Sequence, residues 1–323
     1  RPLLAGDDPA ARLRELLAAR RAAYAQVAHH IDTTQRAPAQ VAEEALRLAA
    51  ARPRVWRISA PGGDYQAQLY EGALADVGAL LRARGVAGGV AVVSDERVWP
   101  LHGERLLEGL RAARYIATPI VIPAGEQFKT LATVSALYDR FLDAGLDRSG
   151  AVVALGGGVV TDMAGFAAAT YMRGVPCVVC PTTLLSMVDA AIGGKTAVDH
   201  PRGKNLIGAF SQPLFVALDP QTLATLPELE RRAGLAEIIK HGVIADPELF
   251  AAFEEAPKGA PPSRRQESEE ASRLEGGAPP PLSMITSSWR GGQRGEVGPA
   301  AGNAPDLRWM LERAIQVKVD VVQ

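Results

Sequence analysis

The chain has 323 residues, of which 47% are hydrophobic and 22% are charged. This ordinary composition supports a sizeable core and excludes wholesale disorder. Lys and Arg number 35 against 36 Asp and Glu, a net charge of -1 that argues against a nucleic-acid partner, because phosphate-backbone binding usually requires a basic excess. Two cysteines, Cys177 and Cys180, are too few for a disulfide framework or a four-cysteine zinc site.

No apolar run reaches the ~18 residues of a membrane span, so we expect no membrane contact. The chain begins at Arg1 rather than at Met and carries no signal-peptide pattern. We therefore expect a cytoplasmic protein whose sequence here starts within a longer gene product.

The first 51 residues are predicted to form two helices. Apolar side chains recur at helical spacing over 9–27, and a second helix is predicted over 41–51, behind Pro38. Two amphipathic helices cannot bury their apolar stripes alone, so this segment needs a partner. A helical dimerisation arm is one reading of it.

The middle of the chain alternates between strand and helix patterns. Strands are predicted over 90–93, 151–155 and 175–180, and helices over 73–84, 106–114 and from about residue 163. Short apolar strands separated by helices predict an α/β domain with a parallel sheet. We assign this domain to residues 52–220.

The remainder, 221–323, is predicted to be helical over 229–244 and 307–322. Between these helices, residues 257–304 hold six large apolar residues against seven Pro and eight Gly. Such a segment offers too little apolar area to offset the loss of chain entropy, so we predict a disordered insert there.

Three motifs carry the chemistry of the middle domain. Gly156, Gly157 and Gly158 follow a predicted strand and precede a helix, an arrangement that lets phosphates approach the backbone at a helix N-terminus; a structural turn is the alternative. The spacing is not that of the GxGxxG fingerprint. Thr182 and Thr183 follow the next strand, where their hydroxyls could bind a nucleotide or cap a helix.

The third motif is a pair of glycine-rich segments, 193–196 and 203–205, which we place on loops. A P-loop is excluded, because Asp189 stands where that motif requires glycine. Lysines and an asparagine on such loops indicate an anionic, phosphorylated small substrate, against the alternative of solvated surface lysines. Further on, Glu237 and Lys240 lie three residues apart on one predicted helix. They could form a salt bridge with each other, or Glu237 could be a metal ligand.

In their order these motifs resemble those of 3-dehydroquinate synthase, over about residues 55–250. The matching segments are 125–129, 156–162, 171–174, 181–189, 193–196, 203–210 and 236–240. The resemblance implies a Rossmann-like, parallel-sheet NAD-binding domain followed by a truncated all-helical metal and substrate domain. It implies an NAD-dependent lyase with a divalent metal, zinc or cobalt. Such an enzyme converts 3-deoxy-D-arabino-heptulosonate 7-phosphate to 3-dehydroquinate and phosphate in the shikimate pathway.

The resemblance also implies roles for individual residues. The residues expected to face the sugar-acid phosphate are Arg173, Asp189, Lys195, Lys204, Asn205, Lys240 and Lys318. The residues expected to bind NAD are Asp95, Glu126, Lys129, Gly157, Gly158, Val159, Asp162, Thr182, Thr183, Leu185, Lys195, Lys204 and Thr225. Glu237 is the expected metal ligand. Arg173 would reach the substrate phosphate across the interface of a homodimer.

Two departures from the family qualify this expectation, one at the metal site and one at residues 257–304, which replace the helical stretch expected there. The family completes its metal site with two histidines that follow the helix of Lys318, whereas the sequence stops at Gln323, so we expect an incomplete metal site. Residues 1–51 resemble the C-terminal end of shikimate kinase, without its P-loop, and predict no kinase activity. We expect a fragment of a bifunctional shikimate kinase/3-dehydroquinate synthase. The alternatives are a non-catalytic NAD-binding remnant and a related polyol dehydrogenase.

Overall fold

The computed structural model describes residues 33, 37–42, 53–254 and 306–323. The chain divides into two units, 1–52 and 53–323. In the first unit, residues 38–42 are helical. The remaining predictions for 1–52, including the kinase-like helices, lie outside the described residues, and so does the insert predicted over 257–304.

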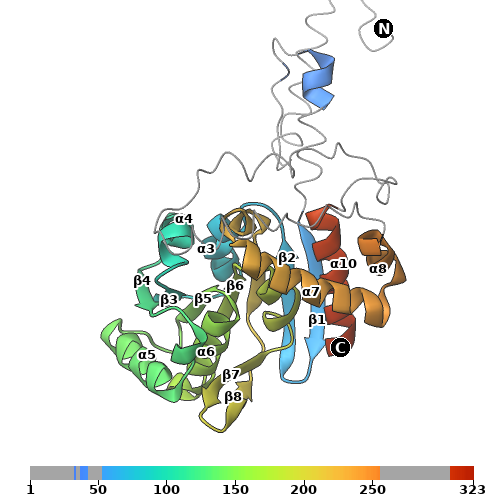
Figure 1. The fold of residues 1–323 in the computed structure, drawn as a ribbon. Helices are drawn as coiled ribbons and strands as arrows, with labels where there is room; N and C mark the ends of the chain where they lie inside the picture. Colours follow the sequence, from blue (N-terminus) through green and yellow to red (C-terminus); the bar gives the residue numbers. More distant parts are fainter. Residues whose placement is uncertain (1–32, 34–36, 43–52, 255–305) are drawn as a thin grey trace, which may run out of the picture. The chain divides into compact units, whose positions relative to one another are not determined.

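The second unit is built on a seven-stranded sheet of order β1-β2-β9-β6-β5-β3-β4 (Figure 1). Its strands are β1 Arg54–Ala60, β2 Gly63–Leu69, β3 Val90–Asp95, β4 Ala117–Ile122, β5 Ala151–Gly156, β6 Cys177–Pro181 and β9 Phe215–Leu218. All neighbouring pairs are parallel except β1 and β2, which form an antiparallel hairpin. The expectation of a parallel sheet is therefore correct for its centre and wrong at the β1 edge.

Helices cover both faces of this sheet. They are α3 Ala73–Ala83, α4 Trp99–Ala112, α5 Leu131–Asp143, α6 Gly158–Thr170, α7 Glu228–Ala245, α8 Pro247–Glu254 and α10 Leu307–Val322. Alternate residues of β3 belong to different cores: Ala91 and Val93 pack with α5 and α6, and Val90 and Val92 pack with α3 and α4. Strands buried on both sides read as continuous apolar runs, which is why the sequence pattern located them.

Four short helical turns link these elements. They are η2 Glu126–Phe128, η3 Tyr171–Arg173, the π-helical η4 Ser186–Ala190, and η5 Pro220–Thr225. A second sheet is the antiparallel hairpin of β7 Lys195–His200 and β8 Gly203–Phe210. Thus the segments 193–196 and 203–205, expected to be loops, contribute mostly to strands, and α6 begins five residues before the predicted Met163. Helix α4 begins at Trp99, ahead of the predicted start at Leu106.

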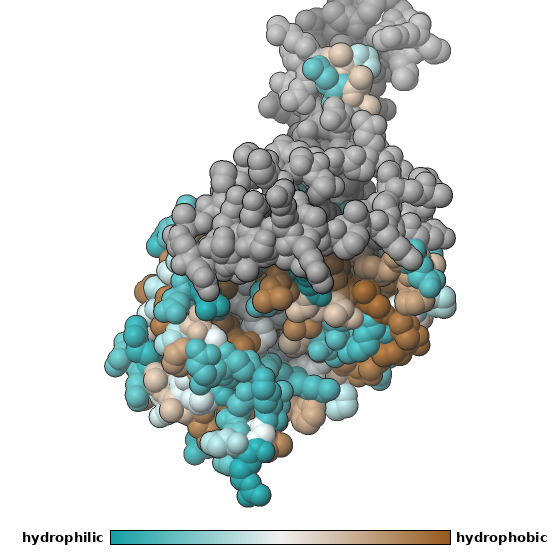
Figure 2. Space-filling view, viewed as in Figure 1, coloured by the Kyte–Doolittle hydropathy of each residue, from teal (hydrophilic) through white to brown (hydrophobic). Residues whose placement is uncertain are grey.

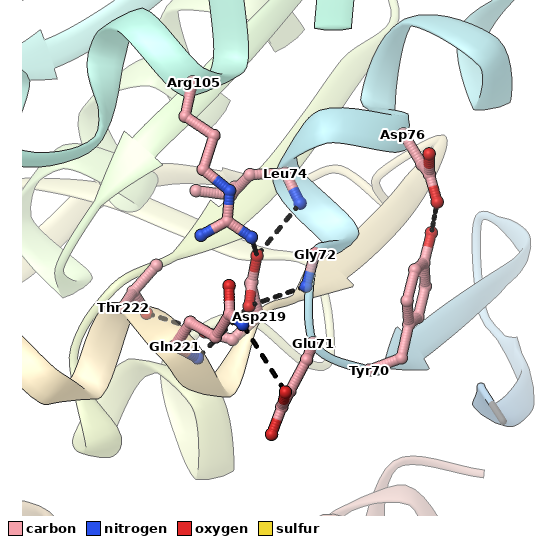
Figure 3. Close-up of polar contacts among 9 residues, drawn as sticks. All are labelled: Tyr70, Glu71, Gly72, Leu74, Asp76, Arg105, Asp219, Gln221 and Thr222. Carbon is pink, nitrogen blue, oxygen red and sulfur yellow. Dashed lines mark hydrogen bonds and ion pairs between the residues drawn. The ribbon is translucent and has the colours of Figure 1, made fainter. Parts of the chain in front are cut away.

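A buried carboxylate joins three of these elements (Figure 3). The side chain of Asp219, fully buried after β9, accepts hydrogen bonds from the backbone N–H groups of Gly72 at 3.2 Å and Leu74 at 3.3 Å. It also caps η5 through the N–H of Gln221 at 3.1 Å and pairs with Arg105 of α4 at 2.6 Å. One side chain therefore fixes the start of α3, the start of η5 and the middle of α4.

Helix α10 returns to the beginning of the sheet, beside β1 (Figure 1). Trp56 of β1 donates its indole N–H to Gln316 at 3.0 Å. Arg313 pairs with Asp246, between α7 and α8, through two hydrogen bonds of 2.6 Å, and reaches Glu248 at 2.8 Å. A bidentate arginine contact of this kind fixes orientation as well as position. None of the described helices is both long and apolar enough to span a bilayer.

The role of Asp219 predicts a large loss of stability on truncation. We expect Asp219→Ala to lower the free energy of unfolding by about 3 kcal/mol or more, because it leaves buried N–H donors without an acceptor and breaks a buried ion pair. Urea unfolding followed by circular dichroism measures this. Glu104→Gln, which removes the exposed pair with Arg111, is the matched control and should change stability little. Equal effects of the two substitutions would contradict this role.

The Asp246–Arg313 contact predicts a pH dependence of stability. Hydrogen bonds from Arg313 lower the pKa of Asp246, so the folded protein binds this proton less readily than the unfolded chain. The resulting stabilisation is complete above the ordinary Asp pKa of about 3.9 and is lost as pH falls through the folded-state pKa. Urea unfolding between about pH 7 and pH 3 should show a shallower acid slope for Asp246→Asn than for the control Asp143→Asn. Identical slopes would exclude the contribution.

Candidate functional site

The carboxyl ends of the parallel strands form one edge of the sheet, where ligands of α/β folds bind. Strand β5 ends at Gly156, and Gly157 is the N-cap of α6, with no side chain capping that helix. A Cβ on Gly156 would lie 2.7 Å from Val160, and one on Gly157 would lie 3.0 Å from Cγ2 of Thr183. The glycines therefore leave the backbone N–H groups at this helix N-terminus uncovered by side chains, which suits the binding of an anionic group. The predicted residues Gly158 and Val159 begin this helix and are half-buried.

The two threonines after β6 differ in their surroundings. Thr183 accepts a hydrogen bond from the N–H of Ser186 at 3.2 Å, so the capping alternative describes this residue. Thr182 is 4% exposed, and its hydroxyl has no hydrogen-bond partner. A buried hydroxyl without a partner costs free energy unless a ligand satisfies it. Leu185, also expected at the cofactor, is exposed one turn further on.

Three polar residues from separate elements converge beside α6. The ammonium of Lys129, which is buried, donates to Asp162 and to the amide oxygen of Asn205, each at 2.6 Å. Burial raises the pKa of the Asp162 carboxyl, and Lys129 opposes the rise. Asn205 adopts a left-handed backbone with φ of 57°, held by a hydrogen bond from its N–H to Asp199 at 2.9 Å. The triad joins α6 to the β7–β8 hairpin.

The outer edge of this region carries four more of the predicted residues. Lys204 of β8 pairs with Glu126 of η2 at 2.9 Å, on the surface. Asp95, at the end of β3, accepts hydrogen bonds from the backbone N–H groups of Arg97 and Val98, just ahead of α4, at 2.8 and 2.9 Å, so it holds the β3–α4 turn as well as being a candidate ligand. Thr225, at the end of η5, lies 2.9 Å from Nε2 of His102 on α4.

Four of the predicted substrate residues, Asp189, Lys195, Asn205 and Lys318, line an open cavity of about 410 Å³ beside the hairpin. Asp189 of η4 and Lys318 of α10 form an ion pair at its wall although 129 positions separate them. Burial acts to raise the pKa of Asp189, but Lys318, with smaller effects from Lys240 and His241, holds that pKa below its ordinary value. Hydrophilic side chains gather around this hairpin in Figure 2.

Three predicted substrate residues, Arg173, Lys204 and Lys240, do not line this cavity. Arg173 is exposed and lies in a turn where both Met172, at φ of 49°, and Arg173, at 67°, have left-handed backbone. The carbonyl of Met172 accepts two hydrogen bonds from Arg148, at 2.9 and 2.7 Å. Lys240 is half exposed on α7 and contacts Glu237.

The residues around Glu237 do not assemble a metal centre. Its carboxylate pairs with Lys240, which is the alternative that the sequence left open, and lies 3.6 Å from Nε2 of the buried His241. In the part of the chain that the structure describes, no group of three His, Cys, Asp or Glu side chains is placed to hold a metal ion. A catalytic zinc usually has three protein ligands, so the described residues do not fit one.

Several residues of this region escaped the sequence analysis. His102 is an isolated histidine on an amphipathic helix, with no neighbouring motif to mark it. Leu206 and Phe210 of β8 line the cavity while largely exposed, at 65% and 80%. Ser94, fully buried next to Asp95, has a hydroxyl without a partner, like Thr182. A serine at the end of an apolar strand was the available signal.

Comparison with known proteins shows similarity to 3-dehydroquinate synthases. Residues 119–233 match the family model of the 3-dehydroquinate synthase N-terminal domain. The chain is 54% identical over 183 residues to 3-dehydroquinate synthase of Geobacter metallireducens, covering 57% of this chain and 51% of that protein. It is 50% identical over 199 residues to that of Synechocystis sp., covering 62% and 55%. The chain spans about half the length of the curated relatives it matches.

Solved structures share the fold. 2-Epi-5-epi-valiolone synthase of Streptomyces hygroscopicus subsp. jinggangensis, with NAD+ and Zn2+ bound, is 32% identical with a TM-score of 0.60, covering 82% of this chain and 63% of that one. 2-Deoxy-scyllo-inosose synthase, complexed with carbaglucose-6-phosphate, NAD+ and Co2+, is 29% identical with a TM-score of 0.56, covering 59% and 52%. An iron-containing alcohol dehydrogenase, 14% identical with a TM-score of 0.53, shares the fold alone. Over the matched residues, the chain is thus similar to 3-dehydroquinate synthases and shares the fold of NAD-binding cyclases.

Proposed function

We propose that residues 53–254 and 306–323 are the NAD-binding half of a 3-dehydroquinate synthase. One observation carries this: an uncapped helix N-terminus at Gly157 and the unpartnered, buried hydroxyl of Thr182 lie on the same edge of the sheet. The N–H groups at the start of α6 would bind the pyrophosphate of NAD, and Thr182 would hydrogen-bond to the cofactor. NAD, when bound, supplies a reversible hydride acceptor for a substrate hydroxyl.

The polar triad gives the pocket its charge pattern. Lys129 would hold Asp162 and Asn205 in place on two sides of the cofactor, the first on α6 and the second on the hairpin. Because all three are linked before any ligand binds, little rearrangement is needed on binding. Asp95 and Glu126, at the outer edge, would bind the adenosine half. Leu185, Lys204 and Thr225 would complete the pocket.

The neighbouring cavity would take the substrate, 3-deoxy-D-arabino-heptulosonate 7-phosphate. Lys195 and Lys318 would bind its anionic groups as cations, and Lys240, outside the cavity lining, would add a positive charge near Asp189. Asp189, kept ionised by Lys318, would accept hydrogen bonds from its hydroxyls. Arg173 would reach the phosphate from a second copy in a homodimer. Holding the substrate in one pose against the cofactor is the contribution of these residues to ring closure.

The described residues do not supply the ligands of a complete metal site. The whole enzyme would use a divalent ion bound through Glu237, but the described residues give that carboxylate an ammonium partner rather than further ligands. This observation favours a second candidate, a chain that binds NAD without turnover. For either candidate, the kinase-like residues 1–51 would be the C-terminal end of a fused shikimate kinase.

Calorimetry and a turnover assay separate these readings. We expect NAD to bind the chain in isothermal titration, because the pocket is already in place. Phosphate release from the seven-carbon substrate, with NAD and zinc present, would establish synthase activity, and its absence with intact NAD binding would establish the non-catalytic reading. Net NADH formation from glycerol would instead indicate a polyol dehydrogenase. An absence of NAD binding would refute the proposal.

The unpartnered hydroxyl gives a sharper test. We expect Thr182→Val to leave the free protein as stable or more stable, because it removes a buried polar group without a partner, while weakening NAD binding about tenfold. Thr161→Val is the matched control: this buried threonine donates to the carbonyl of Gly158 at 3.1 Å, so its loss should cost about 1 kcal/mol of stability. Thermal unfolding and titration measure both. A destabilised Thr182→Val protein with unchanged NAD affinity would contradict this assignment.

A further inference from the structure

Helix α4 touches η5 at two points that lie three residues apart on one face of the helix. Arg105 pairs with Asp219, which precedes η5, and His102 contacts Thr225, the last residue of η5. His102 is 8% exposed, whereas Thr225 is exposed and ends η5, the turn that follows the carboxyl end of β9. The buried histidine therefore contacts an exposed threonine at the carboxyl end of the sheet.

Counting protons fixes how these two side chains bond. Oγ1 of Thr225 lies 3.0 Å from the carbonyl oxygen of Thr222, which can only accept, so the single hydroxyl proton is used there. The contact of 2.9 Å with Nε2 of His102 then requires the histidine to donate. Burial, with a smaller effect of Arg105, lowers the pKa of His102, in keeping with a neutral ring that carries its proton on Nε2.

This arrangement leaves the threonine hydroxyl with one unused function. A hydroxyl has one proton and two lone pairs, and here the proton and one lone pair are occupied. The remaining lone pair can only accept a hydrogen bond. We infer that His102 is a positioning residue that fixes Thr225 as an acceptor for a donor group of the dinucleotide, a hydroxyl of the adenosine ribose or the exocyclic amine of adenine. The inference rests on the proposed function.

Substitutions of His102 that distinguish its hydrogen-bond donor from its size test this inference. His102→Leu removes the donor, and we expect the Kd of NAD to rise about threefold to tenfold, because the threonine rotor is freed. His102→Gln keeps an N–H donor at the corresponding position and should restore the wild-type Kd within about twofold. In a Thr225→Val background, His102→Leu should have no further effect on binding. Glu108→Gln, exposed on the same helix, is the control and should leave the Kd unchanged.

Dinucleotide analogues identify the donor. One analogue has hypoxanthine in place of adenine, and two others lack the 2′ or the 3′ hydroxyl of the adenosine ribose. We expect one analogue to bind the wild-type protein less tightly than NAD does. The same analogue and NAD should bind Thr225→Val with equal affinity, and the group that this analogue lacks is then the donor to Thr225. Equal discrimination by both proteins for every analogue would overturn the acceptor assignment.

The failure modes are distinguishable. If wild-type protein binds NAD and His102→Leu binds it equally well at unchanged stability, the inference is wrong and the proposed function stands. If His102→Gln is as impaired as His102→Leu, the histidine acts by packing and the inference is also wrong. If the wild-type protein does not bind NAD, both the inference and the proposed function fall.

Discussion

The burial of one carboxylate, Asp219, is the constraint on which the site depends. Removing an ion from water is expensive unless donors replace its hydration, and here backbone N–H groups from two elements and one guanidinium do so. Because these donors belong to α3, η5 and α4, the carboxylate sets the relative positions of all three. Residues with no ligand contact thus decide where Thr225 stands at the sheet edge.

How much of this arrangement the sequence predicts depends on the range of the interaction. The strand of 151–155 and the glycines after it are local features, since an apolar run and a conformational requirement both act within a few residues. The helix over 307–322 was predicted with its observed bounds for the same reason. In contrast, the pair of Asp189 with Lys318 spans 129 positions, and only the family resemblance predicts that both lie near substrate.

The misplaced elements have physical causes too. The segments 193–196 and 203–205, at the starts of β7 and β8, were expected to be loops, because glycine and lysine there interrupt the apolar alternation of a half-buried strand. The antiparallel pairing of β1 and β2 was missed because the turn residues between the two strands do not by themselves determine how the strands pair. Asp219 and His102 carry no motif, and only the fold gives them partners.

The contact between Trp56 and Gln316 has a consequence for how the molecule assembles. It joins the first strand of the sheet to a helix 260 positions later in the chain. Contacts of such long range must wait for the closure of a long loop, which makes them late events in folding. A ribosome would release the sheet long before the helix that covers its β1 edge. Until then the apolar side of that strand is open to solvent, and chaperones or neighbouring nascent chains have a period in which to bind it.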